Sequence, residues 1–269
     1  QIEASSGLES EIGILLNIEE DHIDRHKSFE IYKSLKFRVL QESNINISKL
    51  ENKIAGKEFY DYEDYFPESH ILNNPALKKW PMHDVFNLKA SLLALKLILE
   101  QKENLKISDV NDFLDKAIGV FASFEKQPHR FEVLGKVNDV TYVNDSKATN
   151  FDATLKSIES SRNLNKEGNI YLICGGDLKE QDLSKENAVI FKEIKKCFIY
   201  GKDKVLIKEL LSHFTNCVSC ADLDSAYSLA KEESKIGDLV ILSPACSSTD
   251  MFEDYRERGL RFKELVKRS

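Results

Sequence analysis

The 269-residue sequence lacks an apolar run that could cross a membrane. Its longest apolar stretch, residues 91–99, contains Lys96 and is far shorter than the roughly 20 residues that a bilayer requires. No basic and then apolar leader opens the sequence, so we expect neither a secretory signal nor membrane insertion. These absences favour a cytoplasmic protein.

Cysteine is also scarce. The five cysteines are an odd number and are spread over the second half of the chain, which is typical of reduced thiols rather than of a disulfide framework. Cys217 and Cys220 form a lone C-x-x-C pair. Without a second pair, plain packing is favoured over a zinc or redox role.

The sequence has no long Lys/Arg tract. With 38 Lys and Arg against 45 Asp and Glu, its net charge is −7, which argues against a nucleic-acid partner. Hydrophobic residues at 42% and aromatic residues at 9% are enough to build packed cores. At roughly 150 residues per domain, the length predicts about two domains.

In the second half, strand patterns alternate with helix patterns, which predicts a doubly wound α/β domain with a mostly parallel sheet. Residues 131–137 and 140–144 flank Asn138-Asp139, a two-residue hairpin signal. Apolar runs that predict buried strands follow at residues 170–174, 197–200 and 239–243. Helical patterns separate or follow these runs at residues 152–161, 183–195, 203–213, 223–234 and 252–267.

The first half is less regular. An apolar run at residues 12–17 predicts a buried strand, and residues 28–42, 84–103 and 110–118 have helical spacing. Residues 43–81 indicate small strands and loops. Pro128 marks a boundary, so we expect one domain over residues 1–126 and another over residues 127–269.

Polar loops follow four predicted strands of the second half. In open α/β sheets, ligands bind beyond the carboxyl ends of the strands. Taken singly, each loop is better explained as a turn or a helix cap. Together they would gather lysine ammonium groups, hydroxyls and backbone amides suited to a carboxylate or phosphate ligand. The loops are Asn144-Asp145-Ser146-Lys147-Ala148-Thr149-Asn150, Gly175-Gly176-Asp177-Leu178-Lys179, Gly201-Lys202-Asp203 and Pro244-Ala245-Cys246-Ser247-Ser248-Thr249-Asp250.

Two further segments invite a functional interpretation. His22 and His26 have the spacing of two zinc ligands on a helix, but Ile23 stands where a zinc protease needs Glu. A hard-cation site that joins His22 to carboxylates such as Glu3 fits better, and a capping or packing role for His22 is the simpler alternative. Arg130 lies at the predicted domain junction, where it either binds a nucleotide or belongs to a charged surface strand.

Several of these segments together resemble the Mur ligases, and among them the D-glutamate-adding branch. The resemblance extends over essentially the whole chain. It rests on residues 16–22 (LNIEEDH), 32–36 (YKSLK), 129–132 (HRFE), 144–150 (NDSKATN), 175–179 (GGDLK), 242–248 (LSPACSS) and 258–259 (RG).

This resemblance implies a fold and a reaction. The fold would be the C-terminal part of the central ATPase domain, followed by a Rossmann-like C-terminal domain. The reaction would be ADP-forming ligation of D-glutamate to UDP-N-acetylmuramoyl-L-alanine through an acyl phosphate, in peptidoglycan synthesis and hence in cell-wall biogenesis, cell shape and cell division. ATP and Mg²⁺ would be required, and the protein would be a cytoplasmic monomer.

The resemblance also assigns roles to individual residues. It implies that Lys36 is carbamylated and serves magnesium together with Glu3 and His22, and that Lys36, His22 and Lys147 are catalytic. The residues expected to hold ATP are Asn87, Arg130 and Asp145. The residues expected to hold D-glutamate are Lys147, Thr149, Asp177, Lys179, Ser248, Thr249 and Tyr255.

The sequence departs from the family at three points. Glu3 is followed by Ala4-Ser5-Ser6-Gly7-Leu8 and lacks the usual Phe-Gln, and Tyr255 stands where an apolar aromatic residue is common. No Gly-Lys-Ser/Thr phosphate loop occurs in the 269 residues. Because that loop is the main cradle of a triphosphate, and because residue 1 is Gln, we expect a piece of a longer ligase that is inactive by itself.

Two other hypotheses remain open at this point. One is a related amide ligase, similar to folylpolyglutamate synthase, which the HRF and SPAC segments disfavour. The other is a non-catalytic ligand-binding remnant of the fold. The presence of His22, Lys36 and Lys147 together argues against a remnant, because a binding module needs no metal-site lysine.

Overall fold

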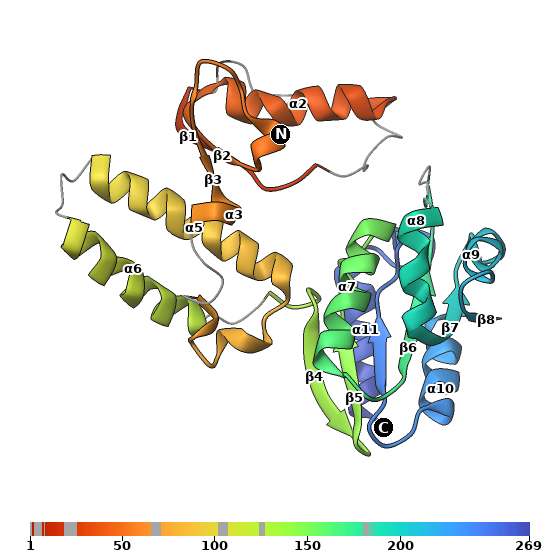
Figure 1. The fold of residues 1–269 in the computed structure, drawn as a ribbon. Helices are drawn as coiled ribbons and strands as arrows, with labels where there is room; N and C mark the ends of the chain where they lie inside the picture. Colours follow the sequence, from red (N-terminus) through yellow and green to blue (C-terminus); the bar gives the residue numbers. More distant parts are fainter. Residues whose placement is uncertain are drawn as a thin grey trace. The chain divides into compact units, whose positions relative to one another are not determined.

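The computed structural model describes residues 2, 7, 9–18, 26–65, 71–101, 107–123, 127–179, 183 and 185–269. The chain divides into two compact units, Gln1–Glu125 and Lys126–Ser269 (Figure 1). Over the described residues, none of the helices combines the length and the apolar character that a membrane span needs.

A three-stranded parallel sheet lies at the centre of the first unit, in the order β1-β2-β3. Helix α2 follows Ser28, whose side chain accepts a hydrogen bond from the Ile31 amide and so caps the helix. The elements of this part are β1 (Ser10–Leu15), α2 (Phe29–Gln41), β2 (Ser43–Ser48), η2 (Leu50–Asn52), β3 (Glu58–Asp61), α3 (Tyr62–Tyr65) and η3 (Leu77–Lys79).

Helix α5 (Met82–Gln101) is buried on two sides. Leu93 and Leu97 pack in one cluster with Ile47 of strand β2. Leu92 packs in a second cluster with Leu114 of α6 (Ile107–Ala122). Apolar residues are therefore needed on two sides of α5, which explains why the helix is apolar over most of its circumference.

The second unit contains a six-stranded sheet in the order β4-β5-β9-β6-β7-β8 (Figure 1). Strand β4 runs antiparallel to β5, and the other strands are parallel. Asn138 and Asp139 have φ values of 51° and 59°, as the two-residue hairpin turn between β4 and β5 requires. The strands are β4 (Glu132–Val137), β5 (Val140–Asn144), β6 (Ile170–Gly175), β7 (Ile194–Tyr200), β8 (Asn216–Ser219) and β9 (Leu239–Leu242).

Helices cover both faces of this sheet. Ile170 and Leu172 of β6 point into one core cluster, whereas Tyr171 and Ile173 point into the other. Because successive strand residues face opposite sides, a strand covered on both faces reads as a continuous apolar run. One face carries α7 (Phe151–Leu164), α8 (Lys185–Ala188), η4 (Val189–Glu193) and α9 (Lys204–Leu211), and the other carries α10 (Leu223–Glu233) and α11 (Tyr255–Lys267).

The structure confirms the predicted α/β fold class, with two differences in the elements. The helical pattern over residues 183–195 is divided into α8 and the 3-10 turn η4, because Ile194 already pairs with Ile170 in the sheet. Strand β8 was not predicted. It is a short edge strand without a fully buried residue, so its sequence shows no continuous apolar run.

Candidate functional site

Four loops meet at the carboxyl edge of the second unit's sheet, because β5, β9, β6 and β7 are consecutive neighbours there. The Asp177 amide donates to the Ser247 carbonyl at 3.1 Å, and the Ser247 amide donates back to Asp177 at 3.0 Å. The Asp203 amide donates to the Gly176 carbonyl at 3.1 Å. The backbones of the loops after β6, β7 and β9 are thus joined directly.

Glycine permits this close approach. A Cβ atom on Gly176 would lie 2.1 Å from the Ser247 carbonyl oxygen, and one on Gly175 would lie 2.0 Å from the Tyr200 carbonyl oxygen. Both glycines also have left-handed φ values, 137° and 128°, which disfavour other residues. The Gly-Gly pair therefore has a structural purpose beyond making a turn, since a side chain at either position would push the loops apart.

Arg258 of α11 forms hydrogen bonds to two of the loops. Its guanidinium is fully buried. It donates to the Ser146 hydroxyl at 3.0 Å, to the Ser146 carbonyl at 2.8 Å and to the Cys246 carbonyl at 3.1 Å. These three bonds join the loop that carries Lys147 to the loop that carries Ser248.

Asp145, which was expected to hold ATP, bonds to the turn at residues 129–131 near the start of the second unit. Its buried carboxylate accepts hydrogen bonds from the Phe131 amide at 2.9 Å and from the Ser157 hydroxyl. The Lys147 amide donates to the His129 carbonyl at 3.0 Å. These bonds fix a turn in which His129 and Phe131 have positive φ values of 67° and 43°. Arg130, between them, is exposed.

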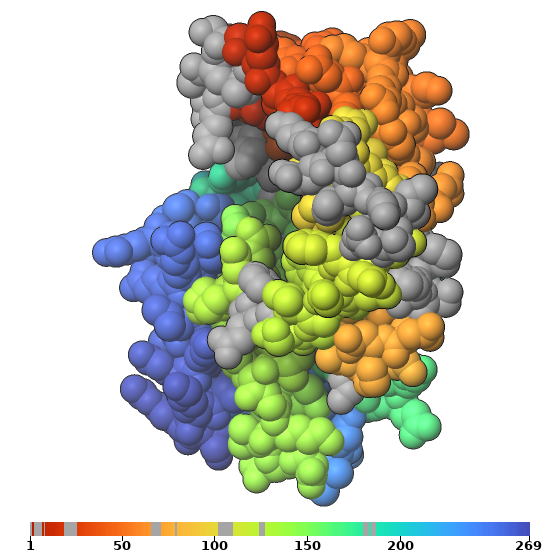
Figure 2. Space-filling view, turned by 90° about the vertical axis from the view of Figure 1, so that its left-hand side faces the viewer, coloured from red at the N-terminus to blue at the C-terminus, as the bar shows by residue number. Residues whose placement is uncertain are grey.

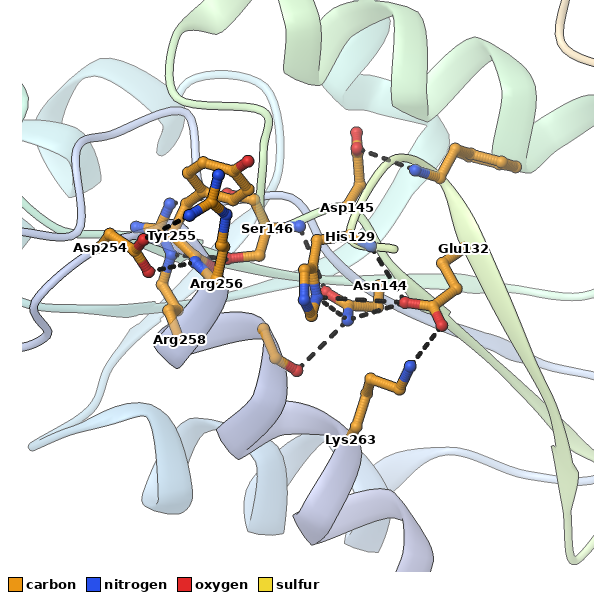
Figure 3. A network of polar contacts seen from close by, with 12 residues as sticks. His129, Glu132, Asn144, Asp145, Ser146, Asp254, Tyr255, Arg256, Arg258 and Lys263 are labelled. Atoms are coloured by element: carbon orange, nitrogen blue, oxygen red, sulfur yellow. Dashed lines mark hydrogen bonds and ion pairs between the residues drawn. The ribbon is translucent and has the colours of Figure 1, made fainter. Parts of the chain in front are cut away.

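A polar network joins this turn to α11 (Figure 3). The Asn144 side-chain amide lies 2.9 Å from His129 Nδ1 and donates to the Gly259 carbonyl at 3.2 Å. Burial lowers the pKa of His129, because the charged imidazole would lose its hydration. The His129 amide donates to Glu132 at 3.0 Å, and Glu132 forms an ion pair with Lys263. Figure 2 shows the light-green hairpin at the surface beside the blue chain of α11.

Glu132 gives this contact a predicted pH dependence. Burial alone would raise its pKa, but hydrogen bonds from Lys263 and the His129 amide prevail and hold it below the ordinary value of 4.5. A carboxyl whose pKa is lower in the folded state stabilises the fold above its unfolded pKa, and this contribution is lost as the pH falls through the folded pKa. We expect about 0.5–1 kcal/mol to be lost below pH 4.5. Urea denaturation at pH 7 and below pH 4 measures it, and Glu132→Gln should lack this part of the acid dependence.

Lys147 and Tyr255, which were both expected to bind D-glutamate, are in contact with each other. The Lys147 ammonium lies 4.6 Å from the centre of the Tyr255 ring, a cation–π contact. The His129 ring meets the same ring edge-on at 6.4 Å. Tyr255 is the first residue of α11, and the Asp254 side chain caps that helix. The ammonium group is thus placed over an aromatic face whose position is set by the helix start.

The other residues expected at D-glutamate lie on the same edge of the sheet. Ser248 is buried, whereas Thr149 is half-buried and Thr249 is exposed, its hydroxyl 3.2 Å from that of Ser247. Lys179 is exposed, with a left-handed φ of 55°. Its amide donates to Asp177 at 3.1 Å. The loops therefore bring ammonium groups, hydroxyls and backbone amides to one edge, as their positions after the strands led us to expect.

The first unit holds the remaining predicted residues. Lys36 lies on α2 with its ammonium 5.3 Å from the centre of the Tyr32 ring, and Asn87 is exposed on α5. Glu3 and His22 lie outside the described residues. No group of three or more metal-ligating side chains gathers within the described part of the chain. Lys36 alone does not make a magnesium site.

Two residues of the edge received no role from the sequence. Arg258 is followed at intervals of four by the buried residues Phe262 and Val266, so its place on the core side of α11 could have been read from helical spacing. Lys202 pairs with Asp177 across two loops, a contact that leaves no signal in the sequence.

Comparison with known proteins shows which proteins this chain resembles. Residues 129–246 match the family described as Mur ligase, glutamate ligase domain. The chain is also similar to two solved structures over most of its length. One is a pseudomurein peptide ligase type C from Methanothermus fervidus (12% identity, TM-score 0.60, 96% of this chain and 63% of that one). The other is E. coli FolC in complex with DHPP and ADP (16% identity, TM-score 0.61, 97% and 63%). At these identities the two structures establish the fold alone.

The chain is therefore similar to Mur ligases over most of its length, and its second unit matches their glutamate ligase domain. Among its curated relatives are two UDP-N-acetylmuramoylalanine–D-glutamate ligases, each 33% identical to it. The relative from Hydrogenobaculum sp. (strain Y04AAS1) is matched over 96% of this chain and 63% of its own length. The relative from Aquifex aeolicus (strain VF5) is matched over 95% and 61%. The chain thus spans somewhat less than two thirds of the length of these relatives.

Proposed function

We propose that this chain contributes to the ATP-dependent addition of D-glutamate to UDP-N-acetylmuramoyl-L-alanine, an ADP-forming step of peptidoglycan synthesis in the cytoplasm. The observation that carries the proposal is the gathering of Lys147, Lys179 and Ser248 on one edge of the C-terminal sheet. The names of the relatives support D-glutamate as the amino acid.

D-glutamate brings two carboxylates to the site, and the C-terminal edge has the groups to bind both. The ammonium groups of Lys147 and Lys179 supply charge, and the hydroxyls of Thr149 and Ser248 supply hydrogen bonds to carboxylate oxygens. The role of these residues is to hold the amine of D-glutamate in a fixed position. Positioning of this kind can contribute about 7–11 kcal/mol to lowering a reaction barrier.

The amine held in this way would attack a carboxyl group that ATP has activated as an acyl phosphate. Asn87, Arg130 and Asp145 are the proposed ATP residues. The exposure of Arg130 supports a ligand-contacting role, whereas Asp145, with its bonds to Phe131 and Ser157, would keep the backbone of that turn in position. Magnesium, when bound, would neutralise phosphate charge. We propose Glu3, His22 and carbamylated Lys36 as its ligands.

A binding experiment tests the proposal apart from turnover. Isothermal titration of the 269-residue chain with D-glutamate should show binding, and L-glutamate should bind more weakly. Phosphate release with ATP, D-glutamate and the UDP precursor should be absent, because the chain contains no Gly-Lys-Ser/Thr loop to cradle the triphosphate. Absence of D-glutamate binding would refute the proposed function, and D-glutamate-dependent phosphate release would refute the expected inactivity.

A further inference from the structure

Lys202 lies next to the proposed D-glutamate site but has no role in it so far. It follows strand β7, and its side chain is 60% exposed. Its ammonium lies 3.1 Å from Oδ2 of Asp177, in the loop after β6. The contact therefore joins two loops of the edge at the surface, where a small ligand can reach it.

The backbone around Lys202 is firmly held. The Lys202 amide donates to Asp250 Oδ2 at 2.9 Å, and the Asp203 amide donates to the Gly176 carbonyl at 3.1 Å. In return, Asp203 Oδ2 accepts from the Leu178 amide at 2.8 Å. Although the side chain is exposed, these three bonds fix the backbone from which it extends, at a point from which its ammonium reaches Asp177.

Asp177 carries a negative charge that Lys202 can compensate. Burial alone would raise the pKa of Asp177, but the hydrogen bonds from Lys202 and the Lys179 amide keep it lower than usual, so the group is charged at neutral pH. One carboxylate oxygen holds the Lys179 amide at 3.1 Å, which supports the left-handed backbone of Lys179. Although the resemblance assigns Asp177 to D-glutamate, a bare carboxylate there would repel the two carboxylates of the ligand unless a cation compensated its charge.

We propose that Lys202 is a positioning residue for dicarboxylate binding, which neutralises Asp177 while Asp177 holds the Lys179 loop in shape. This role rests on the proposed function. Lys202 therefore acts through Asp177, by keeping Lys179 available to the ligand and by removing the repulsion that the Asp177 carboxylate would exert. The groups of opposite charge around Lys202 are Asp177, Asp203 and Asp250.

Titration of the 269-residue chain with D-glutamate tests this role. Lys202→Ala should raise the D-glutamate Kd about fivefold, the upper range for an exposed ion pair. Lys202→Arg should restore binding to within about twofold, because a guanidinium also pairs with a carboxylate. Lys208→Ala, a change of an exposed lysine on α9, controls for the loss of one positive charge. The defect of Lys202→Ala should shrink at high salt.

A double variant separates neutralisation from a general loss of structure. In Asp177→Asn/Lys202→Ala no carboxylate remains to be neutralised, so the double variant should bind D-glutamate more tightly than Lys202→Ala alone. Equal Kd values for the wild type and Lys202→Ala would overturn the role of Lys202 and leave the proposed function intact. Absence of binding by the wild type would overturn both.

Discussion

Replacement of Lys179 by alanine is expected to weaken D-glutamate binding about 10- to 100-fold, and to weaken ATP binding far less. The reason is the loss of a charged hydrogen-bond donor to a carboxylate, an interaction of about 1.5–3 kcal/mol. The Lys179 side chain is exposed, and its backbone is held by Asp177, so the fold should survive the substitution. Isothermal titration with each ligand measures the two effects.

A matched control is available in the segment before the same strand. Lys166 is exposed and precedes β6, so it lies at the opposite edge of the sheet from Lys179, which follows β6. Lys166→Ala removes the same charge and should leave the D-glutamate Kd unchanged. Equal losses of D-glutamate and ATP affinity in Lys179→Ala would contradict the assigned role, because they would indicate a general disturbance of the C-terminal unit.

Arg258→Ala is expected to destabilise the C-terminal unit by about 3 kcal/mol. The substitution removes three hydrogen bonds from a buried guanidinium and leaves the Ser146 and Cys246 carbonyls without this donor. A buried polar group that loses its partner costs about 1–3 kcal/mol. Arg258→Lys should recover only part of the loss, since one ammonium cannot reproduce the planar fork of donors.

Hydrogen exchange can localise this effect. Amides of β5 and β9 should exchange faster in Arg258→Ala, while those of α5 and α6 in the first unit serve as an internal reference. Arg256→Ala, two residues earlier and on an exposed side chain, should change stability by less than about 0.5 kcal/mol. Unchanged protection of β5 and β9 in Arg258→Ala would show that the buried guanidinium does not hold the loops together.

Much of the C-terminal fold could be predicted from local pattern. The runs at residues 170–174 and 239–243 are strands because each is covered by helices on both faces and is apolar throughout. The hairpin followed from Asn138-Asp139. Strand β8 was not predicted, because an edge strand is only partly buried and its sequence therefore shows no continuous apolar run. The helix predicted over residues 183–195 was shortened because pairing of Ile194 with Ile170 outweighs helical propensity.

The site could be predicted only as a set of loops. The order of strands along the chain says that Lys147, Lys179 and Ser248 follow strands, and the carboxyl edge of a parallel sheet brings such loops together. It does not say which loops touch. The Asp177–Ser247 bridge, the Lys202–Asp177 ion pair and the Arg258 contacts join residues that are distant in sequence, so no local spacing encodes them.

The sequence by itself determined the fold class and the resemblance to Mur ligases, because periodic apolar runs and ordered motifs are local properties of a chain. The tertiary structure alone decided how the strands are ordered, and hence that the loop after β9 lies between those after β5 and β6. It also decided that a buried arginine bonds to two loops of the edge and that an exposed lysine pairs with Asp177. The physical reason is that hydrogen bonds and ion pairs depend on separation in space, which the chain acquires only when the sheet has formed.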